Sequence, residues 1–176
     1  DGSTPAVKLN EIAYAYDERL RVKTLNTAPQ TAPASPLIAF GYQFDGASNI
    51  RRIDDQRPGS VVPAGDPRRN SQLFQYDDLY RLTRVQYSFA LPGQGDRNDG
   101  QITYRYDRIG NMLAQFSTLN HVEKGLPVAN LGEMDSGAAA GRWNRAGRAA
   151  NDPPGPHALT AIRHPLSGIR SFPYDS

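Results

Sequence analysis

The residues of this sequence that could do chemistry are five aspartates, each of which directly follows a pair of aromatic side chains. Carboxylates in this number could serve as acid–base groups or as calcium ligands. Both uses require oxygen atoms that converge on one point, whereas the first four aspartates are separated by 28, 32 and 30 residues and the last by 68. The aspartates are Asp17, Asp45, Asp77, Asp107 and Asp175.

The aromatic pairs predict β-strands that carry the aspartates. Side chains alternate between the two faces of a strand, so rings separated by one residue lie on the same face. A helix would place the same two rings about 200° apart. The pairs are Tyr14 and Tyr16, Tyr42 and Phe44, Phe74 and Tyr76, Tyr104 and Tyr106, and Phe172 and Tyr174.

The residues after each aspartate predict a turn. Asp107 is followed by Gly110 and Asn111, two residue types that adopt positive φ at little cost. We expect a strand over 102–106, a turn over 107–111 whose amides donate to Asp107, and a returning strand over 112–117. The other copies vary the turn sequence, and only this one carries Gly and Asn together.

The repeat unit is therefore predicted to be an antiparallel β-hairpin in an all-β fold. Aspartates at successive turns would lie along one edge of a sheet and would not converge. Turn capping is thus the preferred interpretation over acid–base or calcium chemistry, and no catalytic residue, metal site or cofactor is predicted.

Spacing also predicts how the chain is organised. Because a lone hairpin is marginally stable, the copies are expected to pair edge to edge in a single segment over 1–176. Residues 121–156 are interpreted as an irregular insert, and the Gly/Ala-rich part from 135 to 150 is expected outside the sheet. Residues 57–70 form a predicted Pro/Gly/charge loop. The repeat motifs are placed near 14–25, 42–53, 74–87, 104–117 and 172–176.

Composition argues against several other classes of function. Twenty Lys and Arg against 18 Asp and Glu leave a net charge of +2, which does not favour a nucleic-acid groove. There is no cysteine, and His121, His157 and His164 lack the spacing of metal ligands. No apolar run approaches the ~20 residues of a membrane span.

The repeats resemble those of the Rhs or YD-repeat family of large bacterial toxin-associated proteins, whose repeat type is shared with the animal teneurins. Residues 104–111 (YRYDRIGN) are similar to the Tyr-x-Tyr-Asp-x-x-Gly-Asn consensus of that family. Residues 74–82 (FQYDDLYRL) are similar to its Tyr-Asp-x-Leu-x-Arg-Leu variant, and residues 155–160 (GPHALT) to a segment that commonly precedes a repeat.

The resemblance implies a curved sheet of hairpin repeats that forms part of a spiralling hollow shell. It further implies a structural, non-enzymatic segment of a secreted or cell-surface bacterial protein, with neighbouring repeats and a C-terminal toxic domain as partners. Five hairpins cannot close a cavity, so the chain is interpreted as a fragment of a larger protein. An alternative stays open, in which the chain is a surface adhesion module whose repeat aromatics bind glycans. Buried rings would favour the structural shell segment, whereas a row of exposed rings would favour the glycan-binding module.

Overall fold

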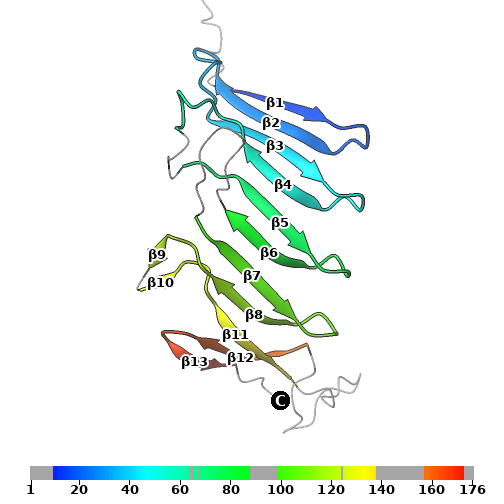
Figure 1. Ribbon diagram of the computed structural model, residues 1–176, viewed down its shortest axis with the longest axis vertical. Coiled ribbons are helices and arrows are strands. Elements are labelled where there is room, and N and C mark those ends of the chain that lie inside the picture. Colours follow the sequence, from blue (N-terminus) through cyan, green and yellow to red (C-terminus); the bar gives the residue numbers. More distant parts are fainter. Residues whose placement is uncertain are drawn as a thin grey trace, which may run out of the picture. The chain divides into compact units, whose positions relative to one another are not determined.

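The structure is a computed structural model that describes residues 10–63, 66, 68–87, 99–123, 125–137 and 157–172. All regular elements in these ranges are β-strands, so the prediction of an all-β fold is confirmed (Figure 1). Eleven strands form one antiparallel sheet, in the order β1-β2-β3-β4-β5-β6-β7-β8-β11-β12-β13. Hairpin neighbours along the chain are thus neighbours in the sheet, as expected for a tandem hairpin repeat.

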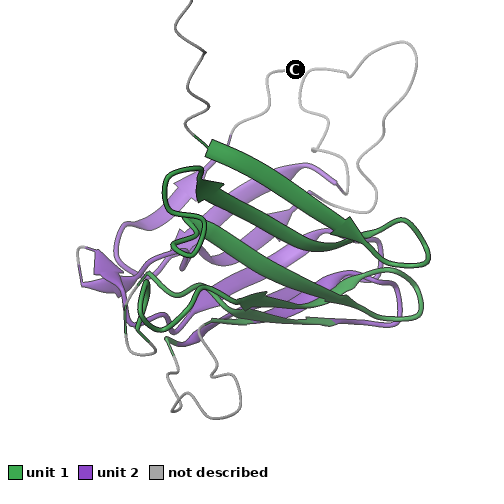
Figure 2. Cartoon of the chain, turned by 90° about the horizontal axis from the view of Figure 1, so that it is seen from above, with its two compact units in different colours: residues 1–75, 86–99 green, residues 76–85, 100–176 purple. Residues whose placement is uncertain are grey.

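The chain divides into two compact units, residues 1–75 with 86–99 and residues 76–85 with 100–176 (Figure 2). The first unit contains β1 (Asn10–Tyr16), β2 (Val22–Pro29), β3 (Ile38–Phe44), β4 (Ile50–Asp55) and all but the last residue of β5 (Gln72–Tyr76). The second contains most of β6 (Leu82–Tyr87), then β7 (Gln101–Tyr106), β8 (Met112–Ser117), β9 (Val122–Glu123), β10 (Leu126–Pro127), β11 (Gly132–Ser136), β12 (Leu159–His164) and β13 (Gly168–Ser171).

The register of the first unit gathers the aromatic side chains on one face of the sheet. Tyr14 lies opposite Leu25, which lies opposite Phe40 on the next strand. Residues directly opposite each other project from the same face, so the rings of β1 and β3 share a face. On the other face lies Asp54, which accepts a hydrogen bond from Arg52. This division explains why the strands alternate apolar and charged residues.

The second unit repeats this division. On the face opposite Tyr106, Arg105 of β7 and Glu133 of β11 approach within 4.0 Å across the intervening β8, and Arg163 and Asp135 approach within 2.6 Å on the neighbouring strands β12 and β11. The predicted strands over 102–106 and 112–117 are confirmed as β7 and β8, with β7 beginning one residue earlier. Ala114 and Ala161 are buried on the same face as these charged pairs.

The interpretation of residues 121–156 as an irregular insert is wrong for the part that the structure describes. β9 and β10 form a small hairpin, and β11 inserts between β8 and β12. The strand was missed because its one large apolar residue, the buried Met134, stands among polar residues. Gly132 at its start has φ +81°, and a Cβ there would collide with the carbonyl oxygen of Arg163. Residues 138–156 lie outside the described ranges.

The predicted loop over 57–70 packs around Asp55, the last residue of β4, in a buried polar cluster that the residue pattern did not predict. Asp55 is fully buried and accepts hydrogen bonds from Arg57 Nη2 at 2.6 Å and from the backbone N–H of Asn70 at 3.0 Å. Arg69, 8% exposed, donates to the carbonyl oxygens of Asp55 at 2.9 Å and Arg57 at 2.7 Å. Burial raises the pKa of Asp55, but the hydrogen bonds from Arg57 and Asn70 outweigh it and lower the pKa overall.

Candidate functional site: the aspartate turns

The four described aspartates hold their turns with one common set of hydrogen bonds. In each copy, Oδ1 accepts from the backbone N–H groups two and four residues later, at 2.8 to 3.0 Å. Oδ2 accepts from the side chain four residues later, at 2.7 to 2.9 Å. The prediction that these aspartates mark hairpin turns is confirmed. The four turns share one hydrogen-bond pattern although their sequences differ. They begin at Asp17, Asp45, Asp77 and Asp107.

Each turn places its fourth residue in the left-handed region. This is the three-residue hairpin loop in which a positive φ closes the turn and leaves a bulge next to it. The positions are Leu20 with φ 60°, Ser48 with 73°, Tyr80 with 59° and Gly110 with 97°. Glycine was expected there for its conformational freedom, yet two large side chains occupy the same conformation because the aspartate satisfies the turn amides.

The residue that faces Oδ2 divides the turns into two types. An arginine occupies this place at Arg21 and Arg81, and an asparagine at Asn49 and Asn111. The two types alternate along the chain, so each compact unit holds one arginine turn and one asparagine turn. The sequence signal for the arginine turns is the Asp-x-x-x-Arg spacing.

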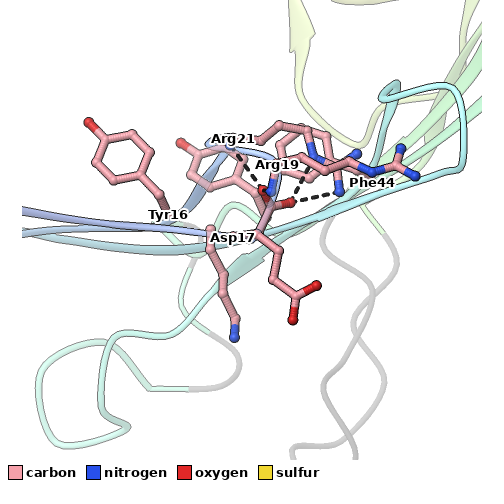
Figure 3. A pocket seen from close by; sticks show the side chains of 8 residues that line it. Tyr16, Asp17, Arg19, Arg21 and Phe44 are labelled. Atoms are coloured by element: carbon pink, nitrogen blue, oxygen red, sulfur yellow. Dashed lines mark hydrogen bonds and ion pairs between the residues drawn. The ribbon is translucent and has the colours of Figure 1, made fainter.

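In the first unit, Arg21 links its own turn to the next one. Its guanidinium donates to Oδ2 of Asp17 at 2.7 Å and lies 4.4 Å from the centroid of the Phe44 ring. Nη1 of Arg21 also donates to Oγ of Ser48 at 3.1 Å. Figure 3 shows Arg21 alongside Asp17, Arg19 and Phe44. One side chain thus joins a carboxylate, an aromatic ring and a neighbouring loop.

The second unit repeats the link with Arg81. It donates to Oδ2 of Asp77 at 2.7 Å and lies 4.9 Å from the centroid of the Tyr106 ring. Nη1 donates to the carbonyl oxygen of Asp107 at 2.7 Å. Charge-assisted hydrogen bonds and cation–π contact act here together. Burial raises the pKa of the Tyr106 hydroxyl, consistent with a ring packed beneath the guanidinium.

The turn hydrogen bonds lower the pKa of all four carboxyl groups. The largest cause is the side chain of Arg21 for Asp17, the side chain of Asn49 for Asp45 and the backbone N–H of Arg81 for Asp77. For Asp107, desolvation raises the pKa, but the hydrogen bonds from Asn111 and the turn amides outweigh it. A carboxylate in this state is a stable acceptor and a poor general acid or base at neutral pH.

The motif aromatics differ in exposure. Tyr14 and Tyr16 on the first strand are 55% and 57% exposed, and their rings stack with centroids 6.5 Å apart. Six more rings are half-buried, and so is Phe172. The guanidinium carbon of Arg170 lies 5.4 Å from the centroid of the Phe172 ring. Tyr174 and Asp175 lie outside the described residues. The six half-buried rings are Tyr42, Phe44, Phe74, Tyr76, Tyr104 and Tyr106.

A pocket of about 450 Å³ opens beside the first arginine turn. Its lining combines rings with charged groups, among them Tyr16, Arg21 and Phe44 (Figure 3). Lys23 also lines it. The full lining is Tyr16, Asp17, Glu18, Arg19, Arg21, Lys23, Tyr42 and Phe44.

The histidines do not gather into a metal site in the described ranges. His157 Nδ1 lies 2.9 Å from Oδ1 of Asn111, so it extends the second asparagine turn. His164 Nδ1 accepts from the backbone N–H of Ser167 at 3.2 Å in the β12–β13 turn. Over the part of the chain that is described, no group of three or more His, Cys, Asp or Glu residues is placed to hold a metal ion. The same residues form no helix that is long and apolar enough to cross a membrane.

Similarity to known proteins is found among solved structures. No protein-family model and no curated protein matches the chain. Among solved structures, one titled "Crystal Structure of TcdB2-TccC3-Cdc42" is similar with 18% sequence identity and a TM-score of 0.48. The match covers 88% of this chain and 9% of the matched chain.

Proposed function

We propose that the chain is a structural, non-enzymatic segment whose hairpins are fastened to one another through the aspartate turns. The link from Arg81 to both Tyr106 and the carbonyl oxygen of Asp107 supports this proposal most directly. It recurs in the other unit at Arg21 and Phe44. Such links resist shearing between successive hairpins, as a wall built from repeats requires.

The absence of catalysis is part of this proposal. Catalysis needs a nucleophile, base or metal held in a preorganised site. The four described aspartates instead have their oxygens committed to turn amides and to side chains of the same turn. Expression of residues 1–176 alone in a susceptible cell should therefore not arrest growth; arrest that a single polar substitution abolishes would contradict the proposal.

The wider role of the protein is proposed on the sequence resemblance. Residues 74–82 and 104–111 carry the motifs of the YD-repeat type, and both form the expected hairpins. We propose a wall segment of a secreted or cell-surface bacterial shell that encloses or helps to deliver a C-terminal toxic domain. Its partners would be neighbouring repeats and that domain, with no nucleic acid.

Glycan binding is retained as a second candidate function because of the first strand. Tyr14 and Tyr16 present exposed, stacked rings, and the pocket beside Arg21 adds polar groups to them. Flat aromatic faces and flanking hydrogen-bonding groups suit sugar rings. The half-buried state of six other motif rings supports the structural role instead.

A double-mutant cycle tests the structural role. The variants are Arg81→Ala, Tyr106→Leu and both together, with urea unfolding as the measurement. A coupling free energy of about 0.5 to 1 kcal/mol is expected for a half-exposed cation–π pair. If the losses in free energy of unfolding of the two single variants add up to that of the double variant, Arg81 and Tyr106 are not coupled. Binding to a glycan array that Tyr16→Ala abolishes without loss of stability would favour the second candidate.

A further inference from the structure

The turn between β12 and β13 is held by a histidine, whereas the four repeat turns are held by aspartates. The backbone N–H groups of Leu166 and Ser167 donate to Nδ1 of His164, with N–N distances of 3.3 and 3.2 Å. In each repeat turn, Oδ1 of the aspartate likewise accepts from two backbone N–H groups. His164 therefore takes the place of the aspartate as the acceptor that closes a hairpin.

This arrangement fixes where the imidazole of His164 carries its proton. A backbone N–H group can only donate, so Nδ1 must offer its lone pair to both donors. In a neutral imidazole one ring nitrogen accepts and the other carries the proton, which places the proton of His164 on Nε2. A second proton would occupy Nδ1 and set an N–H group against two other N–H groups. The closed turn therefore requires the neutral imidazole.

Aspartate and histidine turns should respond differently to mild acid. The carboxyl groups of the repeat turns titrate below about pH 4, since the turn hydrogen bonds lower their pKa. Histidine side chains change charge between about pH 5 and 8. Between pH 8 and 5, the aspartate turns thus keep their acceptor, whereas a histidine turn can lose it.

Strand β13 depends strongly on this turn for its place in the sheet. All four of its residues, Gly168–Ser171, are exposed, and Ile169 is 62% exposed. The strand pairs with β12 from Ala161 to His164, and the N–H of Phe172 donates to the carbonyl oxygen of Thr160 at 2.8 Å. Backbone pairing in a short hairpin is marginal without burial of side chains. Loss of the turn hydrogen bonds should therefore loosen the strand.

Charged groups near the turn act on the imidazole in both directions. His164, Leu166 and Ser167 line a groove of about 620 Å³, and so does Glu123, whose carboxylate lies 3.6 Å from Nε2 of His121. A carboxylate favours a charged imidazole, whereas the two N–H groups at Nδ1 oppose it. The other charged groups on the strands beside His164 are Arg163 on β12, Glu133 and Asp135 on β11, and Arg170 on β13.

We propose that His164 is a pH-dependent latch for β13. The neutral imidazole holds the turn closed, and protonation in mild acid releases it. The open turn binds one proton more than the closed turn, so the stabilisation is present at neutral pH and is lost as the pH falls through the histidine range. Leu166 and Ser167 form one wall of the groove that Leu126 and Leu131 also line, so release of the turn removes that wall. The latch operates whether or not the chain belongs to a shell.

Amide hydrogen exchange of residues 1–176, followed by NMR, tests the latch. The amides of Leu166, Ser167 and Phe172 report on the turn and on the end of the β12–β13 pairing. A histidine in an open turn has a pKa of about 6.5, so uptake of one proton changes the opening equilibrium about tenfold between pH 7.5 and 5.5. Protection factors of these amides should fall by that amount, while those in β7 and β8 stay constant. Constant protection at Leu166, Ser167 and Phe172 would overturn the proposal.

Three variants assign the response to the His164 side chain. His164→Asp supplies the acceptor of the repeat turns and should keep the amides protected at both pH values. His164→Ala removes the acceptor, so protection should be low at both. His121→Gln is the control, because His121 contacts Glu123 beside the groove, and it should leave the tenfold fall unchanged. A fall that persists in His164→Asp or disappears in His121→Gln would overturn the proposal. So would ¹⁵N NMR signals that place the proton of the neutral His164 side chain on Nδ1.

Discussion

The guanidinium of Arg81 lies 4.9 Å from the centroid of the Tyr106 ring while one of its N–H groups donates to the carbonyl oxygen of the next residue, Asp107. The same arginine neutralises Asp77 in its own turn. A single side chain therefore couples two turns that are 30 residues apart in the sequence. Stability of the second unit should depend on this side chain more than on the other arginines of the turns.

Loss of the inter-turn link gives the first prediction. Arg81→Ala should lower the free energy of unfolding by about 1 to 2 kcal/mol, because it removes the cation–π contact and several charge-assisted hydrogen bonds from a partly exposed site. Arg108→Ala is the control, since Arg108 is exposed on the next turn, and should cost less than about 0.5 kcal/mol. Urea denaturation that gives equal losses for the two variants would contradict the link.

The left-handed turn position gives the second prediction. Leu20→Gly should raise the free energy of unfolding by about 0.5 to 1 kcal/mol, because leucine at φ 60° is strained and its side chain is 83% exposed. Gly110→Ala should lower it by about 1 kcal/mol, since it introduces that strain at φ 97°. Thermal and urea unfolding measure both effects. Destabilisation by Leu20→Gly together with stabilisation by Gly110→Ala would contradict the left-handed conformation of this turn position.

The buried polar cluster gives the third prediction. Asp55→Ala should destabilise the first unit by about 3 to 5 kcal/mol, because it leaves Arg57 without its buried partner. Asp66→Ala serves as the comparison. Its partner Arg68 is 67% exposed, and loss of that solvent-exposed pair should cost much less. If both variants unfold at the same urea concentration, the loop is not held by Asp55.

The turn aspartates give the fourth prediction, on pH. Their pKa values are lowered in the folded chain, so near pH 4 and below the unfolded chain binds more protons. The stabilisation is present above the unfolded-state pKa of about 3.9 and is lost as the pH falls through the lower folded-state values. Urea unfolding at pH 7 and at pH 3 should show this loss.

A variant isolates the contribution of one turn to that dependence. Asp45→Asn cannot titrate, so its free energy of unfolding should change less between pH 7 and pH 3 than that of the wild-type chain. If the free energy of unfolding of Asp45→Asn changes between pH 7 and pH 3 by as much as that of the wild-type chain, the turn hydrogen bonds do not favour the carboxylate.

Residue order alone determined the local hairpins of this protein. The spacing of Tyr104, Tyr106 and Asp107 specified two strands and a capped turn, because alternation along a strand and hydrogen bonding by a turn aspartate act within a few residues. The same reasoning failed for β11, whose only strong apolar signal is Met134. That strand exists because β8 and β12 offer open edges on both of its sides.

Tertiary structure decided everything that depends on residues far apart in the sequence. Arg21 and Arg81 acquire their contacts with a second turn only when the next hairpin brings Phe44 and Tyr106 beneath them. Asp55 becomes buried only when the loop that follows it folds back and Arg69 reaches its carbonyl oxygen. Contacts of this kind form when hairpins stack, so no short window of sequence contains both partners.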